Sequence, residues 1–90
     1  MSLTYHVHIH GHVQGVFFRK SMSYQATQLG LFGWVRNLDD GSVEAHISGS
    51  DDACTHMINW CHRGPETAIV DSVLVTKLLE PSPYHSFQIR

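Results

Sequence analysis

Two groups of polar side chains in the first third of the sequence have types and spacings suited to chemistry. The first is a run of histidines at every second position, His6, His8, His10 and His12. Along a strand, residues two apart share a face about 7 Å from each other, so neutral imidazoles at this spacing can share a metal ion if their rotamers converge. A dedicated metal site also recruits a carboxylate or thiolate, and Glu44 is the obvious nearby candidate. We favour a solvated polar strand face and predict no metal ligands.

The second group begins where the alternation ends, at Gly11, and runs to Arg19. Glycine at positions 11 and 15 can adopt backbone angles closed to other residues, which suits a bend from strand into helix. Such a turn can point consecutive N–H groups into one concavity that binds an anion, and the N-terminus of the following helix adds positive potential. Arg19 in the first helical turn can clasp a phosphate or carboxylate. The pattern indicates an anion site, with an ordinary turn and a solvated arginine as the alternative.

Hydrophobic periodicity gives the order of the elements that position these residues. Residues 4–12 alternate as a half-buried strand, with Val7 and Ile9 on the apolar face, and residues 18–29 have helical spacing that stops at Gly30. Strands are expected over 32–38 and 42–48, joined by the hairpin signal Asp40-Gly41. A second helix follows a cap at Ser50 or Asp51 and ends before Gly64-Pro65. Strands are also expected over 69–79 and 86–90, the last with Phe87 and Ile89 buried.

The order β-α-β-β-α-β, with a short extra C-terminal strand, predicts an α+β, ferredoxin-like sandwich. We expect residues 1–90 to form a single domain with an antiparallel sheet and both helices on one face. The other face is expected to be open, because the strands alternate apolar and polar residues. The first and third strands are neighbours in this topology, so His46 joins the histidine face.

Composition narrows the classes of function. With 90 residues and a net charge near −2, the composition argues against a nucleic acid as the main partner, because binding a phosphate backbone needs a basic surface. It lacks the roughly 20 consecutive apolar residues of a membrane helix, and its N-terminus has no basic and apolar segments typical of a secretory signal. Cys54 and Cys61 lie seven residues apart, about 10 Å along one helix, too far for a disulfide. We expect two buried, reduced thiols and a monomeric cytoplasmic protein.

Two segments carry a specific resemblance to a known family. Residues 11–19, Gly-His-Val-Gln-Gly-Val-Phe-Phe-Arg, resemble the first signature of the acylphosphatase family. Residues 33–37, Gly-Trp-Val-Arg-Asn, resemble the second, which continues through Gly41, Val43 and Gly49. The resemblance spans essentially the whole chain, although the ending lacks the frequent final aromatic and His12 stands where Arg or Lys is common.

The resemblance implies a hydrolase that cleaves small acyl phosphates to a carboxylate and inorganic phosphate, without metal or cofactor. It implies that Arg19 binds the phosphoryl group together with backbone N–H groups of Gln14, Gly15, Val16, Phe17 and Phe18. It also implies that Asn37 orients the attacking water. Without the resemblance, Asn37 would be assigned to turn chemistry before Asp39-Asp40-Gly41.

Charged and apolar residues around the loop are expected to have supporting roles. Lys20 and Arg36 are expected to add positive potential, and Val16, Phe17 and Phe18 to staple the helix onto the sheet.

The alternatives to a hydrolase are a non-catalytic binding module, a metal-binding protein based on the histidines, and an RNA-binding sheet face. RNA binding requires aromatic and basic side chains on the sheet, where this sequence has His, Glu, Ser and Gln.

Overall fold

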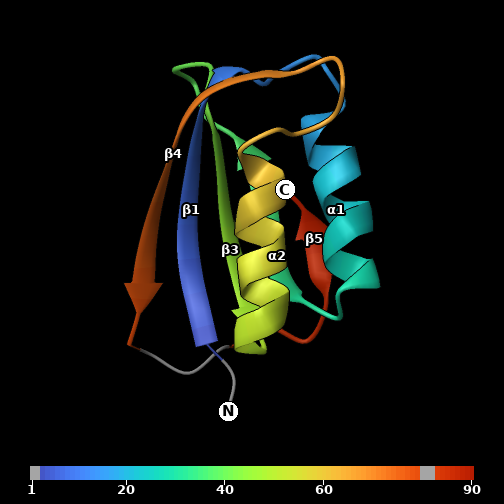
Figure 1. Cartoon of the computed structure of the whole chain (residues 1–90), viewed down its shortest axis with the longest axis vertical. Coiled ribbons are helices and arrows are strands. Elements are labelled where there is room, and N and C mark those ends of the chain that lie inside the picture. Colours follow the sequence, from blue (N-terminus) through green and yellow to red (C-terminus); the bar gives the residue numbers. More distant parts are fainter. Residues whose placement is uncertain (1–2, 80–82) are drawn as a thin grey trace.

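The computed structural model describes residues 3–79 and 83–90. The elements are β1 (Leu3–His12), α1 (Phe18–Gln28), β2 (Phe32–Asn37), β3 (Val43–Gly49), α2 (Asp51–Cys61), β4 (Ile69–Leu78) and β5 (Phe87–Ile89). This order confirms the predicted ferredoxin-like fold. Both helices lie on one face of the sheet (Figure 1). None of the helices in the described part of the chain combines the length and the apolar character needed to cross a membrane.

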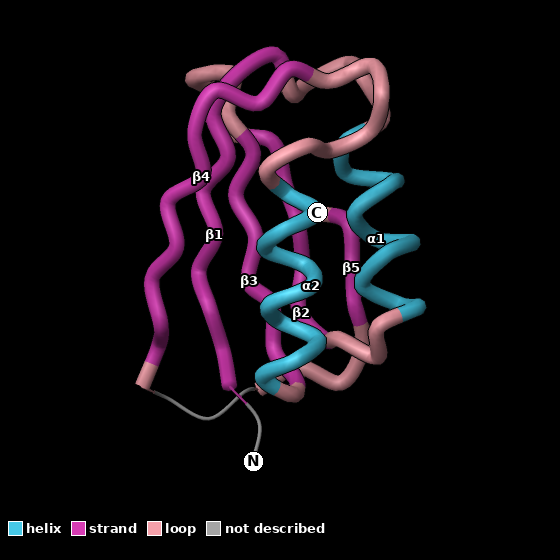
Figure 2. The backbone as a smooth tube through the Cα atoms, in the orientation of Figure 1, coloured by secondary structure: helices cyan, strands magenta, loops and turns pink. Residues whose placement is uncertain are grey.

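The sheet has the strand order β4-β1-β3-β2-β5, with β4 and β5 at opposite edges (Figure 2). β1, β2, β3 and β4 pair antiparallel, but β5 pairs parallel to β2, with Gly33 opposite Phe87. The sheet is therefore mixed, and the expectation of a purely antiparallel sheet was wrong in this detail. The reason is topological: β4 ends at the end of the sheet where β2 begins, so a strand entering there runs in the direction of β2 (Figure 1).

The core lies between the helices and the sheet, as the alternation of apolar residues predicts. Strand side chains and one stripe from each helix are fully or nearly fully buried; they include Val7, Ile9, Val43, Ala45, Ile47, Phe18, Met22, Ala26 and Met57. Cys54 and Cys61 are also buried and free, which confirms the prediction for the thiols. α2 begins as expected, because the Ser50 hydroxyl accepts a hydrogen bond from the Ala53 N–H at 3.2 Å and Asp51 and Asp52 occupy the first turn.

The sheet face opposite the helices is more covered than expected. Segment 83–86 lies across β2 and β3, and the Tyr84 hydroxyl bonds to Trp34 Nε1 at 2.9 Å and to His46 Nδ1 at 2.8 Å. The Trp34 and His46 rings stack with centroids 4.5 Å apart. Burial consequently lowers the pKa of His46, with a further contribution from the neighbouring His6. The alternation of apolar and polar residues predicts which residues face this side of the sheet, but it does not predict which segment covers them.

Candidate active site

The loop between β1 and α1 has a conformation that depends on particular residues. β1 breaks register between His10 and Gly11, and Gly11 has φ 136°. A Cβ there would lie 2.1 Å from the Ile69 carbonyl oxygen, so only glycine fits. Gly15 has φ 73°, and Phe17, immediately before α1, has φ 64°. A left-handed phenylalanine is uncommon, and such backbone strain concentrates at functional sites.

Two side chains hold this loop in place from opposite sides. The Gln14 amide donates from Nε2 to the Leu38 carbonyl at 2.7 Å and to the Ser42 carbonyl at 2.9 Å. The Thr67 hydroxyl donates to the Val16 carbonyl at 2.7 Å. Gln14 thus ties the loop to the β2–β3 hairpin, and Thr67 ties it to the segment before β4. These contacts preorganise the loop and leave the N–H groups of residues 14–19 without an acceptor in the described part of the chain.

The free donors of the loop are the backbone N–H groups of residues 14–19. Within residues 3–79 and 83–90, none of these six groups donates to a protein acceptor. Those of Phe18 and Arg19 open α1, where the first N–H groups of a helix have no intrahelical partner and carry positive partial charge. The segment therefore offers consecutive donors suited to an anion.

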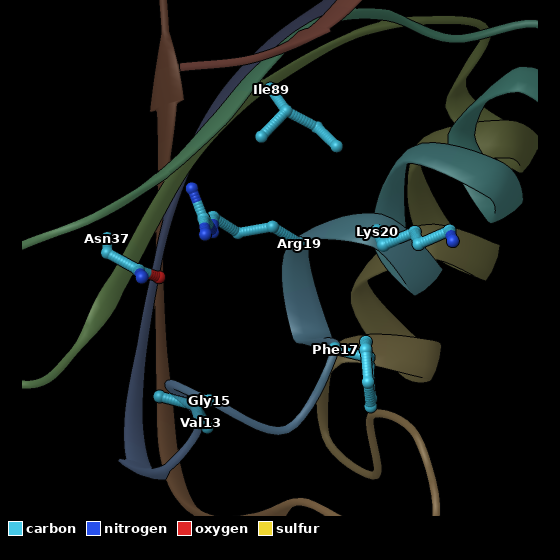
Figure 3. A pocket seen from close by; sticks show the side chains of 7 residues that line it. All are labelled: Val13, Gly15, Phe17, Arg19, Lys20, Asn37 and Ile89. Carbon is cyan, nitrogen blue, oxygen red and sulfur yellow. The ribbon is translucent and has the colours of Figure 1, made fainter.

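A cavity of about 290 Å³ lies at this loop, lined by Val13, Gly15, Phe17, Arg19, Lys20, Asn37 and Ile89. Figure 3 shows the Arg19 side chain reaching from the start of α1 towards Asn37, while the Lys20 side chain points away from both. Arg19 makes no ion pair or hydrogen bond with any other described residue. Since the lining contains cations and no carboxylate, the cavity suits an anionic ligand.

Asn37 faces this cavity from the last position of β2 (Figure 3). Its side-chain amide has no hydrogen-bond partner among the described residues. The turn chemistry that could have engaged Asn37 belongs to Asp40, whose Oδ1 accepts from the Ser42 N–H at 2.9 Å. The hairpin turn itself is closed by the Leu38 N–H donating to the Ser42 carbonyl at 2.9 Å. The Asn37 amide is therefore available to a ligand or to water.

Arg36, expected to add positive potential, does not line the cavity. Its guanidinium pairs with Glu44 Oε1 at 2.6 Å and lies over the Trp34 ring, 5.1 Å from the centroid. His6 donates a hydrogen bond to the other carboxylate oxygen at 2.8 Å. The hydrogen bond from His6 is the main cause that lowers the pKa of Glu44, and the hydrogen bond from Arg36 adds to it. The charge of Arg36 is neutralised locally, so this expectation was wrong. Successive residues of a strand face opposite sides, which separates Arg36 from Asn37.

The predicted site residues fall into two sets. Gly15, Phe17, Arg19 and Asn37 line the cavity, whereas the side chains of Gln14, Val16 and Phe18 do not. Val16 and Phe18 are buried and contribute only backbone to the loop. Phe17, expected to staple the helix, is 72% exposed, because its left-handed backbone turns the ring away from the core.

Sequence reasoning missed Val13 and Ile89 in the cavity lining. Ile89 was predicted to be buried with Phe87 but is 47% exposed. The alternation in the last five residues gave a plausible buried pair. It did not reveal that β5 is an edge strand whose end reaches the mouth of the cavity.

The histidine face has the predicted register. His6 lies opposite His46 in the pairing of β1 with β3. The two rings are 5.4 Å apart, and those of His8 and His10 are 4.1 Å apart. Glu44, the carboxylate expected to complete a metal site, is engaged by His6 and Arg36. The histidines nevertheless stand outside the cavity at Arg19.

Comparison with known proteins identifies the class that this fold and cavity define. The acylphosphatase family model matches residues 5–89. An acylphosphatase from Trichormus variabilis is 48% identical over 85 residues, which cover 94% of this chain and 83% of that protein. Solved structures of acylphosphatases from Bacillus subtilis (TM-score 0.94, 33% identity, 98% of both chains) and Coxiella burnetii (TM-score 0.93, 37% identity, 99% of this chain and 93% of that one) have the same fold.

The chain belongs to the acylphosphatase family, the hydrolases of acyl phosphates. The prediction made from residues 11–19 and 33–37 is thereby confirmed at the level of family, fold and enzyme class.

Proposed function

We propose that the cavity at Arg19 and Asn37 hydrolyses small acyl phosphates to a carboxylate and inorganic phosphate. One observation carries the proposal: a guanidinium and an amide that have no partner among the described residues face the same cavity, beside the six free backbone N–H groups of residues 14–19. The reaction needs a cradle for a dianionic phosphoryl group and a way to place one water molecule. These groups supply both from the chain itself.

The phosphoryl group binds at the loop end of the cavity. Arg19 and the N–H groups of residues 14–19 bond the non-bridging oxygens, on which charge is spread in the transition state. The anchors at Gln14 and Thr67 hold the donors in place before substrate arrives, so little reorganisation is required. In the uncatalysed reaction, water molecules would take the place of these donors and would have to reorient as the charge develops.

Asn37 orients the attacking water on the opposite side of the phosphorus. Its amide offers both a donor and an acceptor, so it can fix the position of the water and the direction of its lone pair. The water oxygen bonds to phosphorus, the bond from phosphorus to the acyl oxygen breaks, and the carboxylate leaves with that electron pair. The proton lost by the water passes to the phosphate product or to solvent. Because a carboxylate is a good leaving group, the step needs neither a strong base nor a metal.

The acyl group lies against the apolar side of the cavity. Phe17 and Ile89 line it, and both are substantially exposed, at 72% and 47%. Covering them with an apolar acyl group removes that surface from water, at roughly 25 cal/mol per Å². The cavity therefore accepts short acyl groups and favours those with a phenyl or alkyl end.

We also propose that the protein acts as a monomer in the cytoplasm. Cys54 and Cys61 are buried free thiols, which fits a reducing compartment. β4 is an edge strand with exposed apolar side chains, but Leu74 lies opposite His8 and Val75 opposite Val7, on different faces. They form no single apolar patch, and Lys77 adds the kind of charge that blunts an edge. Equilibrium sedimentation tests the monomer.

Hydrolysis of benzoyl phosphate by chelator-treated protein tests the proposed function. We expect activity to survive chelation, inorganic phosphate to inhibit competitively, and Arg19→Ala to lower kcat/KM by about 1000-fold or more. Arg63→Ala is the matched control, because Arg63 is exposed and outside the cavity lining. An Arg19→Ala variant as active as Arg63→Ala, or wild-type protein that is folded but inactive, would show that this cavity is not the active site.

A further inference from the structure

A second cluster of ligating side chains lies outside the cavity. It consists of His8 and His10 on β1 and Asp40 in the β2–β3 turn. One ligand atom from each residue, an imidazole nitrogen or a carboxylate oxygen, lies within 4.8 Å of the other two. The topology produces this proximity, because β1 pairs with β3 as far as Ile9 and Val43, so the turn before Val43 lies beside His8 and His10.

The cluster is held together by Ser42. Asp40 Oδ1 accepts hydrogen bonds from the Ser42 N–H at 2.9 Å and from the Ser42 hydroxyl. The same hydroxyl is bonded to His8 Nε2 at 2.7 Å. These bonds fix the carboxylate against the histidines and lower the pKa of Asp40, with the hydrogen bonds from Ser42 as the main cause.

The remaining donor atoms of the cluster are free. Within the described residues, Asp40 Oδ2 and both ring nitrogens of His10 have no hydrogen-bond partner. His10 is half-buried, and its ring lies 4.1 Å from that of His8 by centroids. A metal ion requires nitrogen and oxygen donors that converge, as one donor atom from each of these three residues does. Glu44 is not available to the cluster, because it is bound by His6 and Arg36.

The donor set selects the kind of metal. Zinc bonds imidazole nitrogen and carboxylate oxygen at about 2.0–2.2 Å, so tetrahedral donors lie about 3.4 Å apart. Closing from at most 4.8 Å requires a shift of about 1.4 Å, which side-chain rotation supplies. Two imidazoles with one carboxylate suit Zn²⁺ and its neighbours Cu²⁺ and Ni²⁺, whereas Mg²⁺ and Ca²⁺ prefer oxygen ligands throughout.

We propose that His8, His10 and Asp40 form a binding site for a divalent transition metal ion, with Zn²⁺ as the reference ligand and water in the open position. The bound ion ties the β2–β3 turn to β1 and takes no part in hydrolysis. The same turn accepts the two hydrogen bonds of Gln14, so the ion stabilises the scaffold behind the phosphate loop. The inference stands on ligand geometry and does not rest on the proposed function.

Calorimetric titration of untagged, chelator-treated protein with Zn²⁺ tests the site. We expect one ion per chain, and affinity lowered by about tenfold or more in His10→Gln and in Asp40→Asn. His6→Gln and His12→Gln are matched controls, because both residues belong to the same strand but not to the cluster, and each should bind within about twofold of wild type. Circular dichroism of each metal-free variant establishes that it is folded.

Thermal unfolding gives a second readout. Saturating Zn²⁺ should raise Tm of the wild type by at least about 5 °C, since ligand binding to the folded state stabilises it. The His10→Gln/Asp40→Asn double variant should show no such rise. Absence of stoichiometric binding, or a loss in His6→Gln as large as that in His10→Gln, would overturn the proposal in favour of weak binding spread over the histidine face.

Discussion

Gln14→Leu removes the link between the two halves of the active site while preserving the approximate size of the side chain. Gln14 Nε2 makes hydrogen bonds of 2.7 and 2.9 Å to the carbonyl oxygens of Leu38 and Ser42. Each such bond contributes about 0.5–1.5 kcal/mol net, so losing both should lower the free energy of unfolding by about 2 kcal/mol. For a chain of this length, the corresponding fall in Tm is roughly 8–16 °C.

The same change should lower activity, because the loop carries Arg19 and the hairpin carries Asn37. If the loop shifts by about 1 Å relative to the hairpin, the rate falls by about 100-fold. Urea unfolding followed by tryptophan fluorescence gives the stability, and hydrolysis of benzoyl phosphate gives kcat/KM. A folded Gln14→Leu protein should therefore be both less stable and less active.

Gln28→Leu is the matched control for this experiment. Gln28 is the exposed last residue of α1 and makes no side-chain hydrogen bond with the described residues, so its replacement should change stability by less than about 0.5 kcal/mol. If Gln14→Leu unfolds at the same urea concentration as Gln28→Leu, the two bonds do not stabilise the loop. Unchanged kcat/KM in a measurably destabilised Gln14→Leu would refute the link between the anchor and catalysis.

Three further predictions concern the burial of His46, of the two cysteines and of the acyl group of the substrate. Burial lowers the pKa of His46 below its ordinary 6.5, so below about pH 6.5 the unfolded chain binds a proton more readily than the folded protein does. The free energy of unfolding should therefore fall as the pH is lowered. Urea unfolding at a series of pH values should show a smaller dependence of this free energy on pH in His46→Gln. An unaltered slope would contradict this. Burial raises the pKa of Cys54 to about 11 and that of Cys61 to about 12. At about pH 8 a disulfide reagent should therefore label neither thiol until guanidinium unfolds the protein. Rapid labelling of the folded protein would be inconsistent with the burial of the two thiols. Ile89→Ala should raise KM about fivefold for benzoyl phosphate and less than twofold for acetyl phosphate. The reason is that only the phenyl group is large enough to contact Ile89, and this apolar contact contributes about 1 kcal/mol. Equal effects on both substrates would show that the acyl group binds elsewhere.

Local patterns predicted the fold because its elements depend on local periodicity. Alternation around Val7 and Val43 identified two strands whose inward residues are fully buried. Ser50 marked the start of α2, and Asp40-Gly41 marked the hairpin, since caps and turns depend on side chains close in sequence. The parallel pairing of β5 could not be predicted in this way, because it depends on where β4 leaves the sheet.

The site was predicted less completely, because its geometry depends on contacts between distant residues. Arg19 and Asn37 were identified through the family resemblance, and only the structure shows that their side chains lack a partner among the described residues. The amide of Gln14 reaches a hairpin 24 residues away, and nothing in its local sequence indicates that contact. Asp40 was expected to serve only the turn, but the pairing of β1 with β3 brings it to His8 and His10.

Steady-state hydrolysis of benzoyl phosphate by Asn37→Ala, with inorganic phosphate as inhibitor, separates positioning of water from binding of phosphate. Asn59→Ala is the control, because Asn59 is exposed on α2. If Asn37 orients the water while Arg19 and the loop hold the phosphate, kcat should fall by about 100-fold or more and the inhibition constant of phosphate should change by less than about threefold. An Asn37→Ala enzyme with the kcat of Asn59→Ala, or one that loses phosphate binding as much as it loses rate, would contradict a site in which Asn37 and Arg19 act from opposite sides.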